Sequence, residues 1–517
     1  MKSPPAQPAP TTASLAQARA AQSVQLVLLA LFGLSALHVA GLHAFYAQLP
    51  GENTIGEAGK VYFAQRFAGG EGLFARAASP PHYPSFHGPL FHFLFGVAGK
   101  LLGLSQDGYV VLGRGASITL VLATAALVAW LARRLGAGRP MQALAPLVFL
   151  SSFSIHFVSS SFRPDPWMLF LGVTCCVVVV AGRWRWWAWG LVVALPVASF
   201  FIKPTGFAAA GGVFVALLAL GRWKAALACG AASWALLGAA VGGLQLASGG
   251  EYLASLSDGV GVPYSFSTMW ASLGGAENLA VLAAPALLAP VLLRGEAGAT
   301  RAARVVLAFW GCSLAVNLAA GGRIGSYHYY SLEPFALGSV ALAAGIGKLL
   351  HDGEPKRPRL LIAASATVAL ALLLAPSLAG AVRKPLPGRT VLAVHELLDS
   401  EREAILKLAG ERGIVPFSDD PSLNIQLGSP PTLYVRQQEQ LEAGGRLPQG
   451  SLVESIARAE HALVVLIEPR LPYQPYLTAR GIPGFDEALA RAYQPVEDPF
   501  YFYALFRPAR PLEPRSP

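Results

Sequence analysis

Charged residues are scarce in this sequence. Asp, Glu, Lys and Arg together make up 13% of its 517 residues, whereas they make up about 25% of ordinary soluble domains. Hydrophobic residues make up 54%. Too few charged side chains are present to cover the surface of a soluble protein of this length, so most of the chain is expected to lie in lipid.

Cysteine is scarce as well, and its placement excludes two kinds of site. The four cysteines, Cys175, Cys176, Cys229 and Cys312, all fall inside apolar runs. They cannot form a disulfide framework, and they lack the spacing of a zinc site. The histidines in the stretch 80–90 lack that spacing too. We therefore expect no metal and no cofactor.

The net charge of +10 does not indicate a nucleic-acid partner. The excess of basic residues lies before residue 384, in the apolar part of the chain, where it indicates membrane topology. No repeat with a period of 20 to 50 residues is visible. This argues against a solenoid and against a transporter built from inverted repeats.

Long apolar runs dominate the first three quarters of the chain. A helix crosses a bilayer with about 17 to 25 apolar residues. Eleven runs predict a mainly α, polytopic transmembrane bundle, with spans near 22–45, 114–135, 141–158, 166–182, 186–202, 205–221, 225–247, 276–293, 303–320, 329–350 and 360–382. A further run, Pro89–Leu104, is short and contains Lys100, and we expect it to lie along the membrane interface.

The basic residues orient these spans. With the N-terminus inside, sixteen of the twenty-five Lys and Arg residues in 1–383 fall on the cytoplasmic side, in agreement with the positive-inside rule. Residues 1–21 are then a disordered cytoplasmic N-terminus, and residues 22–383 form the transmembrane domain. Its first outer loop is 46–113, and residues 384–517 lie on the outer side.

The tail after residue 383 differs from the rest of the chain. A helical pattern over Ser400–Glu411 alternates with short apolar strands at Thr432–Arg436 and Ala462–Glu468, which predicts a small α/β domain. Nine of the 39 basic residues are Lys, and the chain is rich in Ala and Gly. This composition indicates a GC-rich bacterium, so we expect a multi-pass protein of the inner membrane with a periplasmic C-terminal domain.

Two acidic residues at the outer ends of spans are candidates for acid–base chemistry. Glu57 begins an amphipathic helix just beyond the first span, and Asp165 stands next to Pro166 at the start of a later span. A carboxylate at such a position can accept a proton from a hydroxyl group. Each residue also has a structural explanation, because acidic side chains stabilise helix N-termini.

Four residues at the same span ends are candidates for binding a phosphate group. Arg163 lies in a proline-constrained loop, Lys203 lies at a junction between two spans, and Arg323 and His328 belong to a turn rich in Tyr. Arginine can bind phosphate through two hydrogen bonds, and a helix N-terminus attracts anions. The alternative for Arg163 is a side chain that only extends to the membrane interface.

Further polar and aromatic residues are expected to line a substrate cavity beside these groups. Ionisable groups at membrane depth are costly and usually line a functional cavity. The alternative for the tyrosines is the aromatic belt of the membrane interface. The cavity candidates are Tyr62, His82, His87, Tyr327 and Glu333.

In their order along the chain, these elements resemble the C-type (GT-C) membrane glycosyltransferases, which include protein O-mannosyltransferases and aminoarabinose transferases. The resemblance covers residues 22–382, with weaker similarity in the tail. It is carried by Glu57, His87-Gly88-Pro89-Leu90, Arg163-Pro164-Asp165, Lys203-Pro204-Thr205 and Ser326-Tyr327-His328-Tyr329. The sequence departs from the family pattern at Gly88, where a proline is usual, and in having no Asp in the first outer loop before Asp107.

The resemblance implies transfer of a hexosyl or pentosyl group from a polyprenyl-phosphate carrier to an acceptor hydroxyl on the outer face, with inversion. Glu57 would be the general base, and Arg163, Lys203, Arg323 and His328 would bind the leaving phosphate. Asp165 would orient Arg163 or the acceptor. The expected partners are membrane lipids, the polyprenyl-phosphate sugar and a glycan, lipid or protein acceptor.

Two other functions stay open at the level of sequence. A transporter or flippase for a lipid-linked or anionic solute would also place charges in a membrane cavity, although it would need access from both faces. A non-enzymatic assembly protein could display the 384–517 domain outside, although eleven predicted spans are many for an anchor.

Overall fold

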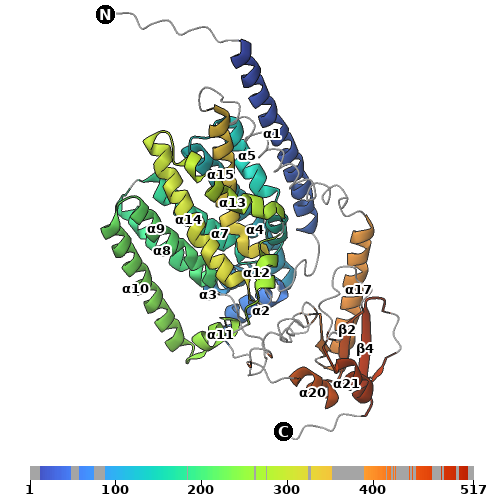
Figure 1. The fold of residues 1–517 in the computed structure, drawn as a ribbon. Coiled ribbons are helices and arrows are strands. Elements are labelled where there is room, and N and C mark those ends of the chain that lie inside the picture. The colour runs from blue at the N-terminus through green and yellow to red at the C-terminus, as the bar shows by residue number, and fades with distance from the viewer. Residues whose placement is uncertain are drawn as a thin grey trace, which may run out of the picture.

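The computed structural model contains two folded units, a helical bundle and a smaller α/β unit (Figure 1). The structure describes residues 12–47, 57–74, 88–182, 184–260, 263–274, 276–323, 326, 328–351, 389–414, 416–420, 423, 426, 442, 445, 450–468, 479, 482–496 and 500–510.

Five helices in these residues are long and apolar enough to cross a membrane. They are α1 (Thr12–Tyr46), α4 (Gln106–Arg134), α10 (Trp223–Ala247), α14 (Ala297–Gly321) and α15 (Leu332–His351), the last taken together with the preceding 3-10 turn η2 (His328–Ser331). The expected class, a helical membrane protein, is confirmed.

Shorter helices fill the rest of the bundle. The apolar ones are α3 (Pro89–Leu102), α7 (Asp165–Ala181), α8 (Trp186–Ile202), η1 (Pro204–Phe207) with α9 (Ala208–Ala219), and α13 (Ala276–Leu292). The others are α2 (Glu57–Ala68), α5 (Arg139–Leu150), α6 (Phe153–Ser159), α11 (Glu251–Val260) and α12 (Phe266–Ser272).

The helices differ from the predicted spans at several places. The run predicted as one span over 141–158 is divided between α5 and α6, because Ser152 caps α6 by accepting a hydrogen bond from the amide of Ser154. The predicted span 360–382 lies outside the described residues. The number of spans therefore stays a prediction.

Two helices begin earlier than the apolar runs indicated. Helix α1 starts at Thr12, inside the segment predicted to be disordered, because the Ala-rich stretch before the first span has a high helix propensity. Helix α4 starts at Gln106, where Ser105 caps it by accepting a hydrogen bond from the Gly108 amide. Arg114, which the sequence indicated as the start of a span, consequently lies inside a helix.

Helix α15 occupies the centre of the bundle. Of the apolar window of the span formed by η2 and α15, 94% is buried, compared with 22% for α10 at the periphery. Small residues allow this close packing: a Cβ atom at Gly338 would overlap with the backbone carbonyl of Val281 in α13. The turn η2, which directly precedes α15, is therefore held in place by the packing of α15 in the bundle.

The C-terminal unit confirms the predicted small α/β fold. Helices α17 (Arg389–Arg412), α20 (Ser451–Ala457) and α21 (Phe485–Ala492) pack with a four-stranded sheet of order β1-β2-β4-β3. Its strands are β1 (Phe417–Ser418), β2 (Val464–Ile467), β3 (Tyr493–Pro495) and β4 (Tyr503–Pro508). Strands β1 and β2 are parallel, and the other pairs are antiparallel.

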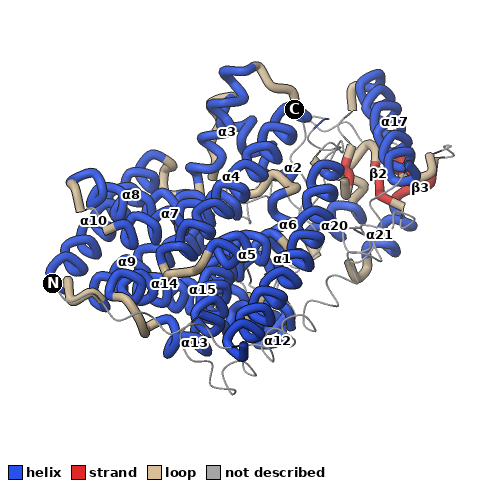
Figure 2. The backbone as a smooth tube through the Cα atoms, turned by 90° about the horizontal axis from the view of Figure 1, so that it is seen from above, coloured by secondary structure: helices blue, strands red, loops and turns tan. Residues whose placement is uncertain are grey.

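Figure 2 shows that the strands are confined to this unit. The predicted strand at 462–468 contains β2, and the predicted strand at 432–436 lies outside the described residues.

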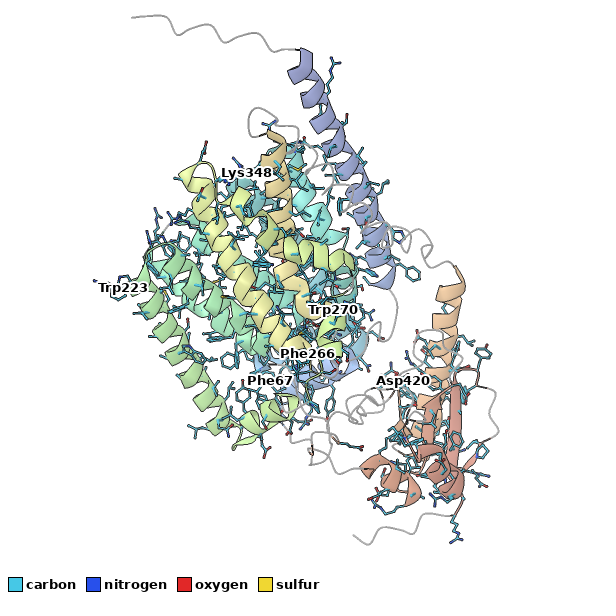
Figure 3. All side chains as sticks on the ribbon, in the orientation of Figure 1. Phe67, Trp223, Phe266, Trp270, Lys348 and Asp420 are labelled. Atoms are coloured by element: carbon cyan, nitrogen blue, oxygen red, sulfur yellow. The ribbon has the colours of Figure 1, made fainter. Side chains whose placement is uncertain are left out.

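The segments that carry the candidate residues gather at one end of the bundle. Helices α2 and α11 lie at the end near the C-terminal unit, and the N-terminus of α1 projects from the opposite end (Figure 1). Figure 3 likewise has Phe67 of α2 and Lys348 of α15 at opposite ends of the bundle. Helix α2, from the first predicted outer loop, and the C-terminal unit therefore lie at the same end of the bundle (Figure 1), and the membrane topology stays a prediction.

Candidate functional site

A buried ion pair joins α2 to α4. The Arg114 Nε and Nη2 atoms donate to the Oε1 and Oε2 atoms of Glu57 at 3.0 and 2.9 Å. The backbone amide of Phe162 donates to the same Oε1 at 2.5 Å. Glu57 and Arg114 are 0% and 1% exposed. Two hydrogen bonds from a guanidinium fix the orientation of a carboxylate, so the side chain of Glu57 is held in one position.

A second buried cluster is centred on Asp165. The Arg163 Nε atom donates to Oδ2 at 3.0 Å, and the Lys203 Nζ atom donates to Oδ1 at 2.7 Å. Asp165 is fully buried, and the two cations are nearly so. Each carboxylate oxygen therefore faces a different cation, and the two cations are held side by side.

Local backbone chemistry explains how Lys203 reaches this position. It has an extended backbone, with φ −153° and ψ 130°, between α8 and η1. Proline disfavours the α conformation in the residue that precedes it. Pro204 therefore ends α8, and the chain turns at Lys203. Similarly, Pro166 at the start of α7 leaves Asp165 in the first turn, where a carboxylate stabilises the helix N-terminus.

Aromatic rings cover the cations on another side. The Arg163 Cζ atom lies 4.2 Å from the centroid of the Tyr329 ring, and the Lys203 Nζ atom lies 4.1 Å from that of Tyr330. Both tyrosines belong to η2, the turn that leads into α15. Phe157 of α6 stacks on Tyr329, with the ring centroids 6.1 Å apart. Cation–π contacts of this kind are stronger where water is excluded.

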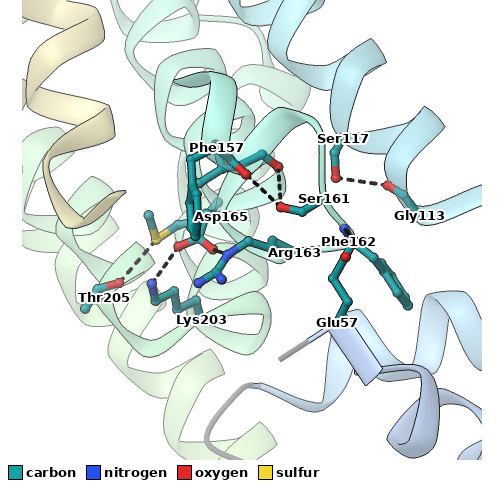
Figure 4. A network of polar contacts seen from close by, with 12 residues as sticks. Glu57, Gly113, Ser117, Phe157, Ser161, Phe162, Arg163, Asp165, Lys203 and Thr205 are labelled. Atoms are coloured by element: carbon teal, nitrogen blue, oxygen red, sulfur yellow. Dashed lines mark hydrogen bonds and ion pairs between the residues drawn. The ribbon is translucent and has the colours of Figure 1, made fainter. Parts of the chain in front are cut away.

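The two ion clusters are neighbours in the loop between α6 and α7. Phe162 binds Glu57 through its backbone, and the next residue, Arg163, binds Asp165 through its side chain (Figure 4). The loop lies very close to α4: a Cβ atom at Gly113 would overlap with the ring of Phe162. We refer to Glu57, Arg114, Arg163, Asp165 and Lys203 as the charge cluster. Three cations and two carboxylates leave it with one net positive charge.

Other predicted residues take no part in the ion pairs described for this cluster, although His328 lies beside Phe157, whose ring also contacts Arg163. Tyr62 accepts a hydrogen bond from Arg66 at 3.3 Å; burial raises the pKa of Tyr62, and the charge of Arg66 opposes that rise. Arg323 pairs through its backbone with Tyr264 before α12. The ring of His328 lies 5.4 Å from that of Phe157.

The remaining predicted cavity residues are Glu333, which is packed against Gly172 of α7, and His82, His87 and Tyr327, which lie outside the described residues.

Three residues of this region were not predicted from the sequence. Arg114 was predicted to be the start of a span, and Tyr330 was noted in the Tyr-rich turn without a role of its own. Lys60, one helical turn after Glu57, is 4% exposed. Burial, and next the charge of Lys60, lower the pKa of His92 to about 3, so His92 is neutral near pH 7. The spacing of Glu57 and Lys60 on one face of a helix was the available signal for Lys60.

The cluster has the chemistry to bind an anionic ligand. Both carboxylates are already bound by cations, and the net charge is positive. Among the described residues, no group of three or more His, Cys, Asp or Glu side chains could hold a metal ion. A buried pair of cations beside aromatic rings matches a phosphate group that carries an apolar chain.

No protein-family model matches the sequence, and no curated protein matches it. Solved structures do match the fold. ArnT from Cupriavidus metallidurans bound to undecaprenyl phosphate aligns with a TM-score of 0.55 and 14% identity, over 92% of this chain and 97% of ArnT.

Two structures of the oligosaccharyltransferase of Archaeoglobus fulgidus align with lower scores. The complex with a tethered acceptor peptide has a TM-score of 0.48 and 12% identity, over 92% of this chain and 74% of that one. The complex of AglB with an inhibitory peptide and a dolichol-phosphate has a TM-score of 0.43 and 13% identity, over 68% of this chain and 56% of that one.

The similarity to ArnT extends over nearly the whole of both chains, including the C-terminal α/β unit. The chain therefore has the fold of the C-type membrane glycosyltransferases, as its sequence motifs predicted.

Proposed function

We propose that this protein transfers a sugar from a polyprenyl-phosphate carrier to an acceptor hydroxyl group at the outer face of the bacterial inner membrane. The observation that carries the proposal is the pairing of Arg163 and Lys203 on one buried carboxylate, Asp165, at one end of a bundle with the ArnT fold. ArnT has been solved bound to undecaprenyl phosphate, which supports the same class of carrier here.

The two cations suit the phosphate of such a carrier. Removal of the sugar leaves a phosphate monoester whose negative charge grows as the C1–O bond breaks. Prepositioned cations in a site with little water stabilise this charge more than they stabilise the bound donor. Asp165 acts as a positioning residue that keeps both cations in place. We assign Arg323 and His328 to further contacts with the phosphate.

Glu57 is proposed to be the general base. The acceptor oxygen forms a bond to C1 of the sugar from the face opposite the phosphate, its proton passes to Glu57, and the configuration at C1 is inverted. The two hydrogen bonds from Arg114 keep the Glu57 carboxylate oriented, and a base has to be in position before the reaction. In this proposal one of the two hydrogen bonds from Arg114 to Glu57 weakens when the carboxylate accepts the proton.

The surrounding residues complete the proposed site. Tyr62, His82, His87 and Tyr327 are assigned to the walls around the sugar and the acceptor. No cofactor is involved, and the donor is a hexosyl or pentosyl lipid phosphate. The acceptor is a glycan, a lipid or a protein of the cell envelope, and the C-terminal unit at the same end of the bundle is periplasmic in this arrangement.

The proposal is tested by measuring the release of polyprenyl phosphate. The purified protein is mixed with a panel of polyprenyl-phosphate hexoses and pentoses and with cell-envelope acceptors. The matched variants are Lys203→Ala and, as a control, Lys407→Ala, whose side chain is 78% exposed. We expect release by the wild type and by Lys407→Ala, and a loss of at least about tenfold in Lys203→Ala, corresponding to about 1.4 kcal/mol.

Absence of release from every donor, by protein that is folded, would contradict the proposal. Substrate-dependent flux across proteoliposomes in that case would support a transporter.

A further inference from the structure

Glu333 is a carboxyl group in the bundle that the proposed reaction does not use. It lies in the first turn of α15 and is 1% exposed. Its Oε1 atom has no hydrogen-bond partner among the described residues. In this respect it differs from Glu57 and Asp165, each of which binds at least one cation.

Polar but uncharged groups surround Glu333. The side chain of Ser313 in α14 hydrogen-bonds to it. Among the described residues, the titratable groups that face it are three thiols, Cys175 and Cys176 of α7 and Cys312 of α14. All three cysteines are free, and no described ion pair involves Glu333. These contacts include one hydrogen bond that stabilises a negative charge, that of Ser313, and no cation.

The contact of Glu333 with α7 is close. A Cβ atom at Gly172 would lie 2.8 Å from Oε1 and 2.9 Å from Cδ of Glu333. A methyl group at position 172 would therefore force the carboxyl end of the Glu333 side chain to move away from α7. Gly172 lies two helical turns after Asp165, which is about 10 Å along the axis. The carboxyl group therefore touches the same helix as the charge cluster, deeper in the bundle.

We propose that Glu333 is held as a neutral carboxylic acid and that its contact with Gly172 and Ser313 positions the two tyrosines of η2 over Arg163 and Lys203. An ionised carboxylate without a partner at this depth would cost several kcal/mol, whereas the neutral acid is both a donor and an acceptor of hydrogen bonds.

The connection to the site runs through the backbone. Tyr329 and Tyr330 end only a few residues before Glu333, and η2 leads directly into α15. The carboxyl group contacts Gly172 of α7 and Ser313 of α14, and Asp165 begins α7. In the proposal, these contacts keep the start of α15, and with it the tyrosine rings, in place over the cations that Asp165 binds. Their effect on donor binding rests on the proposed function, but the protonation of Glu333 does not.

The first test measures the protonation state of Glu333 and needs no enzymatic activity. The infrared spectrum of the wild-type protein near pH 7, minus that of Glu333→Gln, is expected to contain a positive carbonyl band of a protonated carboxylic acid in a dry environment. A carboxylate band in its place would overturn the inference. Because no substrate is added, this result is independent of whether the protein is a glycosyltransferase.

The second test measures, through the donor KM, whether Glu333 positions the tyrosines. Glu333→Gln keeps the shape and hydrogen bonds of the neutral acid, so the donor KM is expected to stay within about threefold of wild type, whereas Glu333→Ala and Gly172→Ala raise it about tenfold. Gly311→Ala in α14 is the matched control, because a Cβ atom there has no neighbour within 4 Å. Thermal unfolding of each variant in detergent separates loss of the fold from loss of positioning.

A KM in Glu333→Gln as high as in Glu333→Ala would overturn the positioning role, since it would mean that an ionisable group is needed. If no donor reacts at all, the same variants are compared for binding of polyprenyl phosphate, and the infrared result stands by itself.

Discussion

Lys203 and Asp165 lie 38 positions apart in the sequence, yet the Lys203 Nζ atom is 2.7 Å from Oδ1 of Asp165 in the interior of the bundle. The pair joins the junction between α8 and η1 to the first turn of α7. It also determines where the second cation, Arg163, can lie, because both cations share one carboxylate. Within the charge cluster, Arg163, Asp165 and Lys203 therefore form a single unit, and these three residues should respond together to substitution.

This coupling predicts a non-additive double-mutant cycle. Lys203→Met leaves a buried carboxylate with one cation fewer, and Asp165→Asn leaves two buried cations without a carboxylate. Each single variant is expected to destabilise the protein by about 3–5 kcal/mol. The double variant should lose clearly less than the sum, because it leaves Arg163 as the one unpaired charge, whereas Asp165→Asn alone leaves two. Thermal unfolding in detergent measures all three, and simple additivity would mean that the pair does not act as a unit.

A second prediction separates the base from the donor site. Glu57→Gln preserves the size of the side chain but removes the proton acceptor, so kcat should fall by about a hundredfold or more while the donor KM changes little. Glu411→Gln is the control, because its side chain is 62% exposed. Steady-state kinetics with the reactive donor give both constants. Turnover close to that of the wild type would remove Glu57 from the reaction.

A third prediction concerns the loop that joins the two ion clusters. In Gly113→Ala the new methyl group would overlap with the ring of Phe162, whose amide binds Glu57. We expect a lower unfolding temperature, from a loss of about 1–3 kcal/mol, and lower turnover. Gly115→Ala on the same helix has no neighbour within 4 Å and should behave like the wild type. Equal behaviour of the two variants would contradict the packing described for this loop.

A fourth prediction concerns metal ions. In the proposed reaction, Arg163 and Lys203 supply the positive charge that a divalent cation would otherwise supply to a phosphate, and the carboxylate beside them, Asp165, is engaged in ion pairs. Sugar transfer is therefore expected to continue at an unchanged rate after dialysis against EDTA. Loss of transfer that added Mg²⁺, Mn²⁺ or Zn²⁺ restores would show that a metal takes part.

The sequence predicted the class of fold and most of the helices, because long apolar runs and prolines mark helices in lipid with little ambiguity. The predicted helix boundaries were wrong where a single polar side chain caps the helix. Ser105 starts α4 before the apolar run begins, and Ser152 divides a predicted span into α5 and α6. A cap of this kind acts through one hydrogen bond, and a single serine hardly changes the hydropathy of the segment around it.

The candidate site was predicted as a set of residues rather than as a network. Asp165, Arg163 and Lys203 were recognised because each stands beside a proline at the end of a span. Their mutual pairing depends on how α7 and α8 pack, which no local pattern specifies. Arg114 was overlooked for the same reason: its partner, Glu57, is 57 positions away. The depth of Glu333 likewise follows from the central position of α15.

The central claim is that the charge cluster binds the phosphate of a polyprenyl carrier, and the most direct test compares two ligands that differ only in that group. Binding of polyprenyl phosphate and of the matching polyprenol is measured on the purified protein in detergent, for the wild type and for Lys203→Ala. The wild type should prefer the phosphate by at least about tenfold, which is about 1.4 kcal/mol, and Lys203→Ala should lose most of that preference. Equal affinity of the wild type for both ligands, or an unchanged preference in Lys203→Ala, would contradict the account.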